Sequence, residues 1–229
     1  MSTLLLRLSA PLQSWGTDSK FDVRRTLSFP TKSGVIGMIA SAMGYSREDS
    51  PEELNRLKFG IRADHEGKLM RDYHTAIPEK GEPYTTNRYY LTDAVFLAGL
   101  ESDDTDKLRE IENALKNPAH PIFLGRRSCP PTMPLVIGIR EKDLLTALKT
   151  EPWLLEEWRQ KKIYDEESRK LRIITDSDKD GNGSVIRDVA VSFNPVQRKF
   201  GWRNVRDCGY IDAMTATEDT EHNPMAELE

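Results

Sequence analysis

The segment FPTKSGVIGMIASAMG at residues 29–44 constrains the fold of this chain more than any other stretch. Pro30 and Thr31 suit the start of a helix. The apolar residues that follow recur at helical spacing on one face, and they are Val35, Ile36, Ile39, Ala40 and Met43. An apolar run at residues 3–8 (TLLLRL) comes shortly before and predicts a buried strand. The chain therefore begins with a strand that leads through a polar loop into a helix.

The first turn of this helix contains Lys32, Ser33 and Gly34. Free backbone N–H groups and the helix dipole both favour a phosphate at such a position, and Lys32 adds a positive charge. An anion site and a well-capped core helix are both consistent with the pattern. Trp15, in the preceding loop, looks exposed and could either stack on a base or cap the sheet.

The rest of the first 140 residues continues the alternation of strands and helices. A short helix is expected over 51–57, with Ser50 as its N-cap, and strands at 58–64 and 69–77 are expected to pair across a turn at 65–67. An apolar strand at 91–100, an amphipathic helix at 104–116 and a strand at 121–125 follow. This order predicts an α+β fold with a ferredoxin-like or RRM-like antiparallel sheet. The polar stretch 78–90 is either a flexible loop or a hairpin that projects from the sheet.

Beyond residue 140 the pattern becomes rich in strands. A strand at 136–139 and a helix at 142–149 precede three strands at 171–175, 185–193 and 199–205. No linker rich in Gly, Pro or Ser separates the halves. We therefore expect an RRM-like domain over 1–140, with its hairpin at about 78–90, and a β-rich extension over 141–211 packed on it.

The distribution of charge favours a nucleic-acid partner, although the net charge is −4. Residues 212–229 hold six acids and no Lys or Arg, which predicts a disordered acidic tail. Without this tail, 33 basic residues stand against 31 acidic ones. The windows 120–140 and 195–206 contain basic but no acidic residues. Local clusters of this kind create the electrostatic footprint of a nucleic-acid site.

Several classes of protein and site do not fit the sequence. No apolar run approaches the length of about 18 residues that a membrane span needs, and the N-terminus lacks a basic signal region, so a cytoplasmic protein without membrane contact is expected. Cys129 and Cys208 are not part of a CxxC pair, which argues against a zinc site. The run from Asp176 imitates the start of an EF-hand, but its twelfth position is Arg187 rather than Glu. We expect neither a metal nor a cofactor.

Three short motifs carry groups that could bind or cleave RNA. Arg126, Arg127 and Ser128 follow Gly125 in a loop before two prolines, and adjacent guanidiniums suit phosphate oxygens. Residues 88–90 (RYY) combine a cation with two aromatic rings, as recognition of single-stranded RNA requires. His74, beside Tyr73, could serve as a general acid or base. Alternation along a strand places these two side chains on opposite faces, which favours a structural or RNA-contacting His74.

The amino-acid sequences of several segments resemble those of the Cas-five family, in the CasD-type form found in type I-E CRISPR Cascade complexes. The resemblance rests on LRLSAPLQSWG (6–16), RRTLSFPTKSGVIGMIASAMG (24–44), RDYHTA (71–76), NRYYLTDAVFL (87–97) and LGRRSCPP (124–131). These motifs stand in the family's order and span residues 4–131. The last hundred residues carry no matching motif.

The resemblance implies a non-catalytic subunit that holds the 5′ handle of the CRISPR RNA at one end of the complex. The implied partners are the backbone subunit CasC and the large subunit CasA, with target DNA reached only through the complex. The RNA-binding set is then Gln13, Ser14, Trp15, Arg24, Arg25, Lys32, Ser33, Gly34, His74, Arg88, Tyr89, Tyr90, Arg126, Arg127 and Ser128. The type I-C form of the family cleaves precursor CRISPR RNA, so a metal-independent endoribonuclease is the alternative. A free RNA-binding module is a third interpretation.

Overall fold

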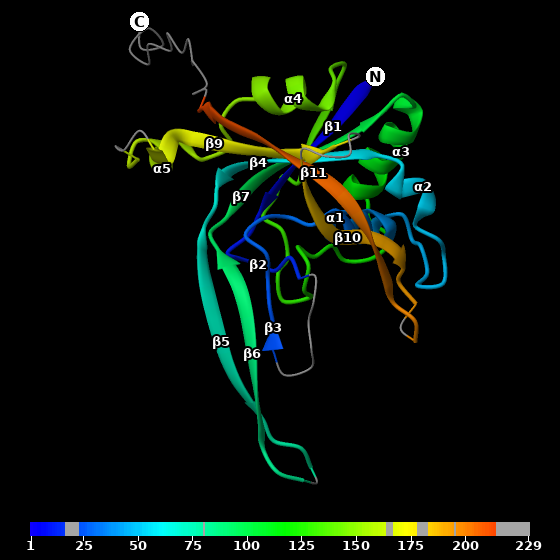
Figure 1. The fold of residues 1–229 in the computed structure, drawn as a ribbon, viewed down its shortest axis with the longest axis vertical. Helices are drawn as coiled ribbons and strands as arrows, with labels where there is room; N and C mark the ends of the chain where they lie inside the picture. The colour runs from blue at the N-terminus through cyan, green and yellow to red at the C-terminus, as the bar shows by residue number, and fades with distance from the viewer. Residues whose placement is uncertain (17–22, 80, 164–166, 178–182, 195, 214–229) are drawn as a thin grey trace, which may run out of the picture.

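A seven-stranded antiparallel sheet forms the body of the protein in the computed structural model, which describes residues 1–16, 23–79, 81–163, 167–177, 183–194 and 196–213 (Figure 1). Its strand order is β10-β11-β9-β4-β7-β1-β8. The strands are β1 (Ser2–Ser9), β4 (Lys58–His65), β7 (Val95–Ser102), β8 (Val136–Arg140), β9 (Lys170–Asp176), β10 (Ser184–Ser192) and β11 (Lys199–Asp212). The fold is therefore α+β with a large antiparallel sheet, as predicted.

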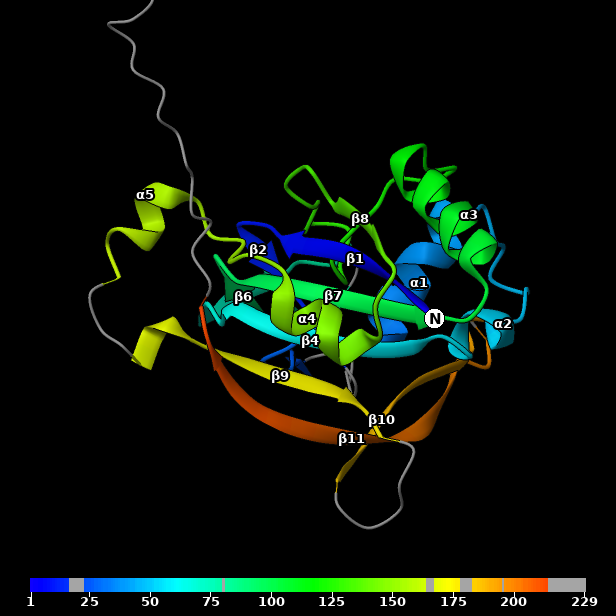
Figure 2. The same ribbon diagram turned by 90° about the horizontal axis from the view of Figure 1, so that it is seen from above.

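Helices cover both faces of the central strands, which explains why β1 is apolar at nearly every position. Leu4, Leu6 and Leu8 of β1 belong to the main core, with α1 (Lys32–Ala42) and α3 (Thr105–Lys116). Leu5 points the other way and packs with α4 (Leu144–Thr150). Figure 2 shows α4 lying across β4 and β7. The shorter helices are α2 (Glu52–Asn55), α5 (Glu157–Gln160) and a 3-10 turn at Glu167–Arg169.

A second, smaller sheet carries a long hairpin away from the body (Figure 1). In this sheet β6 (Tyr84–Thr92) pairs along its whole length with β5 (Lys68–Ala76). At its base β6 also pairs with β2 (Leu12–Gln13) and, in parallel, with β3 (Val23–Arg24). The predicted hairpin at 78–90 exists, but it is longer than predicted and begins at residue 68.

The structure corrects three local predictions. The strands at 58–64 and 69–77 do not pair with each other, because β4 pairs with β7 and β9 while β5 enters the second sheet. The predicted strand at 91–100 is divided at Asp93, whose φ of 56° breaks the extended chain between β6 and β7. Residues 121–125 form no strand. Pro121 and the tight loop at Gly125 leave this segment only isolated hydrogen bonds, such as Ser14 N–H to Leu124 O.

The remaining predicted elements are present with shifted ends. The short helix expected from Ser50 reduces to Glu52–Asn55, with Ser50 Oγ accepting a hydrogen bond from the Glu52 N–H. The three strands beyond residue 170 join the same sheet through β9, beside β4. Of the predicted acidic tail, residues 214–229 lie outside the described residues. No helix in the described part of the chain is long and apolar enough to cross a membrane.

Candidate nucleic-acid interface

A groove of about 820 Å³ opens beside α1, and five separate parts of the sequence line it. They are the loop after β2, helix α1, the loop after α1, the loop that follows α3, and the region where β10 leads into β11. Of the predicted site residues, those that line the groove are Ser14, Trp15, Ser33, Gly34, Arg126 and Arg127. Motifs separated by more than a hundred residues in the chain therefore meet at one surface.

The groove is basic and aromatic. Within the part of the chain that the structure describes, its lining residues include four arginines and one histidine, and no Asp or Glu is among them. The basic side chains are Arg47, Arg126, Arg127, Arg198 and His120. The aromatic ones are Trp15, Tyr45, Phe123, Phe193 and Phe200. Trp15 is buried and the other four rings are half-buried. Positive charge together with partly exposed rings is a composition that can bind the backbone and bases of single-stranded nucleic acid.

The loop 124–129 presents the two adjacent arginines. It is closed by hydrogen bonds from Leu124 N–H to Cys129 O and from Cys129 N–H to Arg126 O, both 2.8 Å. Gly125 has a φ of 91°, and a Cβ added there would lie 1.7 Å from Ser14 O. Only glycine fits this conformation and this close approach, so the glycine fixes the loop against the strand-to-helix connection.

The two arginines of this loop differ in their surroundings. Arg126 lies over the Tyr90 ring, 4.6 Å from its centroid, and donates to Arg24 O at 2.8 Å. Its Nη1 is buried without a hydrogen-bond partner among the described residues. Arg127 is exposed and makes no side-chain hydrogen bond or ion pair with any residue that the structure describes. Arg126 thus joins the loop to β6, whereas the Arg127 guanidinium is available to a ligand.

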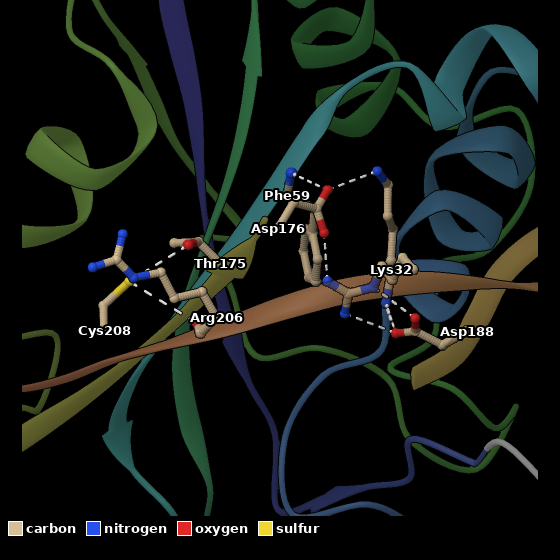
Figure 3. A network of polar contacts seen from close by, with 8 residues as sticks. Lys32, Phe59, Thr175, Asp176, Asp188, Arg206 and Cys208 are labelled. Atoms are coloured by element: carbon tan, nitrogen blue, oxygen red, sulfur yellow. Dashed lines mark hydrogen bonds and ion pairs between the residues drawn. The ribbon is translucent and has the colours of Figure 1, made fainter. Parts of the chain in front are cut away.

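The predicted phosphate site at the start of α1 is wrong, because protein carboxylates already occupy that position. Asp188 accepts a 2.8 Å hydrogen bond from the Lys32 N–H, and the N-cap Thr31 accepts one from Gly34 N–H. The Lys32 ammonium is 2.9 Å from an oxygen of Asp176 and is almost fully buried. Figure 3 shows both aspartates reaching Lys32 from the neighbouring strands. The helix N-terminus binds an anion, as its electrostatics require, but the anion is internal.

Arg203 completes this buried network of Lys32, Asp176, Asp188 and Arg203. Its guanidinium forms two hydrogen bonds to Asp188 and one to Asp176. Burial by itself would lower the pKa of Arg203, but the hydrogen bonds and charges of Asp188 and Asp176 raise it above its ordinary value. Arg203, from the predicted basic window 195–206, is therefore a structural cation and not a ligand contact.

Two predicted RNA contacts in the loop after β2 are also wrong. Trp15 is only 1% exposed, and a Cβ added at Gly34 would lie 2.8 Å from its ring. Gln13 is fully buried, donates to Leu8 O and Ala94 O, and accepts from Trp15 Nε1. These side chains hold the first loop against the core. Ser14 is buried as well, and its hydroxyl donates a hydrogen bond to Tyr89 O.

The base of the hairpin adds a second basic surface. Arg24 and Arg88 are partners in the parallel pairing of β3 and β6, and Arg24 and Arg25 are exposed. The Arg88 Nε is buried without a hydrogen-bond partner among the described residues. Tyr89 is half-buried. Tyr90 belongs to the main core, and its ring forms a cation–π contact with Arg126. Tyr90 therefore supports the site from beneath instead of stacking on a base.

His74 lies on the hairpin, opposite Thr86, while its neighbour Tyr73 lies opposite Asn87. Consecutive residues of a strand point to opposite faces, so the two side chains do not converge, as expected. A further reactive group near the site is Cys129 of the loop 124–129. Burial raises the pKa of its thiol, which leaves it in the protonated, weakly nucleophilic form.

No group of three His, Cys, Asp or Glu side chains in the described part of the chain is arranged to hold a metal ion. Asp176, the first residue of the EF-hand-like run, is occupied by Lys32 and Arg203. The following positions 178–182 lie outside the described residues.

Comparison with known proteins identifies the family. A family model described as CRISPR-associated protein (Cas5) matches residues 3–206, which is most of the chain. The chain belongs to the Cas-five family. A curated relative, the CRISPR system Cascade subunit CasD of Escherichia coli (strain K12), is 35% identical over 158 residues, covering 60% of this chain and 70% of the relative.

Two solved structures share the fold of this Cas-five protein over nearly its whole length. One, described as a Cas protein, has a TM-score of 0.71 at 35% identity, with 92% of this chain and 95% of that chain covered. The other, described as a CRISPR RNA-guided surveillance complex, has a TM-score of 0.76 at 31% identity, with 92% and 91% covered. Coverage of this extent means that the shared fold also includes much of the described chain beyond residue 131, where no motif is recognisable.

Several lining residues of this Cas-five groove were not predicted as site residues. They are Arg47, His120, Phe193, Arg198 and Phe200. Arg198 lies in the basic window 195–206, which gave a partial signal. Arg47 and His120 stand in loops, and Phe193 and Phe200 lie at the ends of predicted strands, where no local pattern indicates a ligand contact. Only the packing of these loops around α1 brings them together.

Proposed function

We propose that this Cas-five protein is a non-catalytic subunit of a type I-E Cascade complex that binds the 5′ handle of the CRISPR RNA. The observation that carries the proposal is the groove, where four arginines and several aromatic rings meet, with no acidic residue among the described residues that line it. The family, and the similarity to a relative named as a Cascade subunit, support the assignment to such a complex. A solved structure of similar fold is described as an RNA-guided complex, which also supports an RNA ligand.

The fold is consistent with an RRM-like origin of this function. The strands β8-β1-β7-β4 are adjacent and antiparallel, and α1 and α3 connect them in the order strand, helix, strand, strand, helix, strand. This order resembles that of a ferredoxin-like sheet and supports the RRM-like interpretation. RRM domains stack bases on the open face of that sheet. Here α4 packs Leu144 and Leu148 against Leu5 and Leu97 on one face, so we place the RNA at the groove beside α1 instead.

The hairpin of β5 and β6 is the element that we assign to contact with neighbouring subunits. Its large apolar side chains are mostly exposed, at 65% for Leu69, 62% for Tyr73, 79% for Ile77 and 52% for Tyr84. Apolar groups at such exposure are stabilised when a partner covers them. We propose the backbone subunit CasC as that partner, with the protein capping the row of backbone subunits and also contacting the large subunit CasA.

The proposal is tested by binding of a CRISPR RNA handle to the purified protein and to the assembled complex. Handle RNA should bind more tightly than an unrelated RNA of equal length, and the affinity should fall as salt rises. If neither the protein nor the complex prefers the handle, the proposed function is wrong.

The endoribonuclease alternative has a separate test. Incubation of the protein with repeat RNA in EDTA should leave the RNA intact. His74→Ala should leave RNA processing unchanged in a reconstituted complex. Specific cleavage of the repeat that disappears in a folded His74→Ala variant would instead establish a nuclease.

A further inference from the structure

The hairpin of β5 and β6 continues the strand pair formed by β4 and β7, and the ribbon turns where the two pairs meet (Figure 1). The β4–β7 ladder ends at the pair of His65 with Val95. Residues 66–67 on one strand and 93–94 on the other lie between that pair and the first pair of the hairpin. The direction in which the hairpin leaves the body is therefore decided within these four residues.

The backbone is bent on both strands at this junction. Gly67 has a φ of 73° and Asp93 a φ of 56°, and Asp93 is the one residue other than glycine with a positive φ in the described part of the chain. The two bends are in contact, since a Cβ added at Gly67 would lie 2.4 Å from Thr92 O. A non-glycine residue in this region is strained, and such a conformation persists where surrounding contacts hold it.

The backbone of Asp93 contacts three separate segments. Its N–H donates to Pro11 O in the loop after β1, at 3.1 Å. Its carbonyl oxygen accepts from Nδ1 of His65 at 3.0 Å and from Nη2 of Arg159 at 3.4 Å. A carbonyl can only accept, so Nδ1 of His65 carries the proton in this contact. The loop after β1, the end of β4 and helix α5 therefore meet at the residue where the chain leaves the hairpin.

The segment that carries Arg159 is itself fixed to the body. The Glu156 carboxylate lies 2.8 Å from Nη2 of Arg7 in β1 and 3.7 Å from Nη1 of Arg159. Trp153, just before it in the chain, is buried in a core cluster with Val95. Arg159 thus reaches from an element that is held on the main sheet to the connection between β6 and β7.

We propose that His65 and Arg159 are positioning residues, which fix the direction of the hairpin by holding the Asp93 carbonyl. Neither residue belongs to the hairpin strands. With nine residues in each strand the hairpin is about 30 Å long, so a rotation of about 10° at the junction moves its tip by about 5 Å. This inference rests on the docking role assigned to the hairpin under the proposed function, and it adds which residues orient the hairpin for docking.

The test measures the direction of the hairpin in the isolated full chain. Nitroxide labels are attached through Glu79→Cys near the hairpin tip and Lys149→Cys on α4, in a Cys208→Ser background, because Cys208 is half-buried while Cys129 is buried. Pulsed electron paramagnetic resonance should give one narrow distance distribution for the parent. In His65→Ala/Arg159→Ala the distribution should broaden, or its mean should shift by about 5 Å or more. The melting temperature should stay nearly unchanged, whereas co-purification with backbone subunits should fall.

Conservative variants and a matched control separate positioning from a general structural effect. His65→Asn and Arg159→Lys each keep a donor for the Asp93 carbonyl, so together they should restore most of the parent's distance distribution and its assembly. Arg109→Ala removes an arginine of α3 whose side chain is 64% exposed and pairs with Asp106, and it should behave like the parent. If the double alanine variant melts far below the parent, the two single alanine variants are measured in its place.

Two results would overturn the positioning role. One is a folded alanine variant that keeps the distance distribution of the parent. The other is a failure of His65→Asn/Arg159→Lys to restore it. A parent protein that does not assemble with backbone subunits would contradict the docking role in the proposed function, while the distances in the isolated chain would still decide whether these two residues orient the hairpin.

Discussion

Arg126 and Arg127 are adjacent in the chain, but their surroundings in the structure differ. Arg126 contacts the Tyr90 ring and Arg24 O, whereas Arg127 is exposed and unpaired among the described residues. We expect Arg127→Ala to weaken RNA binding and to reduce the salt slope by about 0.7 without changing the melting temperature. Arg126→Ala should weaken binding and also lower the melting temperature, because it removes the link between the loop 124–129 and β6.

Filter binding at several salt concentrations, together with thermal melts, measures both effects. Arg126→Lys keeps the charge but loses the planar guanidinium, so it should keep most of the slope and lose some stability. Equal behaviour of Arg126→Ala and Arg127→Ala in both measurements would contradict the distinction.

Gly125 sets the position of both arginines. Its φ of 91°, and the distance of only 1.7 Å that would separate an added Cβ from Ser14 O, mean that any side chain must push the loop away from Ser14. Gly125→Ala should therefore lower stability and RNA affinity together, in spite of leaving every guanidinium in place. Gly81→Ala is a matched control, because Gly81 also has a positive φ but its nearest atom would be 3.6 Å away. RNA binding by Gly125→Ala that equals that of Gly81→Ala would show that the loop tolerates the shift.

At the level of elements, the buried network of Lys32, Asp176, Asp188 and Arg203 ties α1 to β9, β10 and β11. Asp188 is fully buried and serves both the start of α1 and Arg203. Asp188→Ala leaves Arg203 partly unpaired in the core, and we expect it to reduce the free energy of unfolding by about 3 kcal/mol or more. Asp188→Asn should cost less, because the amide oxygen still accepts from the Lys32 N–H.

Urea denaturation measures these differences. Asp207→Ala is the control, since it removes an ion pair with Arg172 whose side chains are 48% and 37% exposed, and it should cost at most about 1 kcal/mol. If Asp188→Ala costs no more than Asp207→Ala, the network does not hold these elements together.

The tip of the hairpin is the second element with a separable role. The described residues between Ile77 and Pro83 are exposed or half-buried, whereas Thr86 is buried and donates to His74 O. Replacing residues 78–83 with a short Gly-Ser turn should leave the melting temperature nearly unchanged, because little burial is lost. Assembly with backbone subunits should be impaired, as co-purification would show. A large loss of stability, or normal assembly, would contradict the docking role.

At the scale of the whole molecule, the net charge of −4 repels RNA, whereas the basic groove attracts it. Residues 214–229 contribute five acids and no Lys or Arg. Truncation after Ala213 should therefore tighten non-specific RNA binding at low salt. The gain should shrink between about 0.01 M and 0.15 M salt, as the Debye length falls from about 30 Å to 8 Å. A gain that does not depend on salt would point to direct blocking of the groove.

The sequence alone was sufficient for features that depend on local pattern. The apolar run of β1, the N-cap Thr31 and the amphipathic α3 follow from periodicity and capping chemistry, which act within a few residues. The sequences of short motifs also predicted the family, and the match to the family model confirms that prediction. Of the groove's lining residues, Arg126 and Arg127 were among the RNA-binding candidates chosen from the sequence, and their contact with RNA stays a prediction.

Tertiary structure alone decided which of the candidate groups face a ligand. Lys32 looked like a phosphate-binding cation until Asp176, 144 residues away in the chain, was placed beside it. Trp15 looked exposed in a polar loop, but its ring is buried and donates to Gln13 in the core. Phe193 and Arg198 line the groove only because β10 packs against α1. Charge neutralisation and burial depend on contacts between distant segments, so no local pattern contains them.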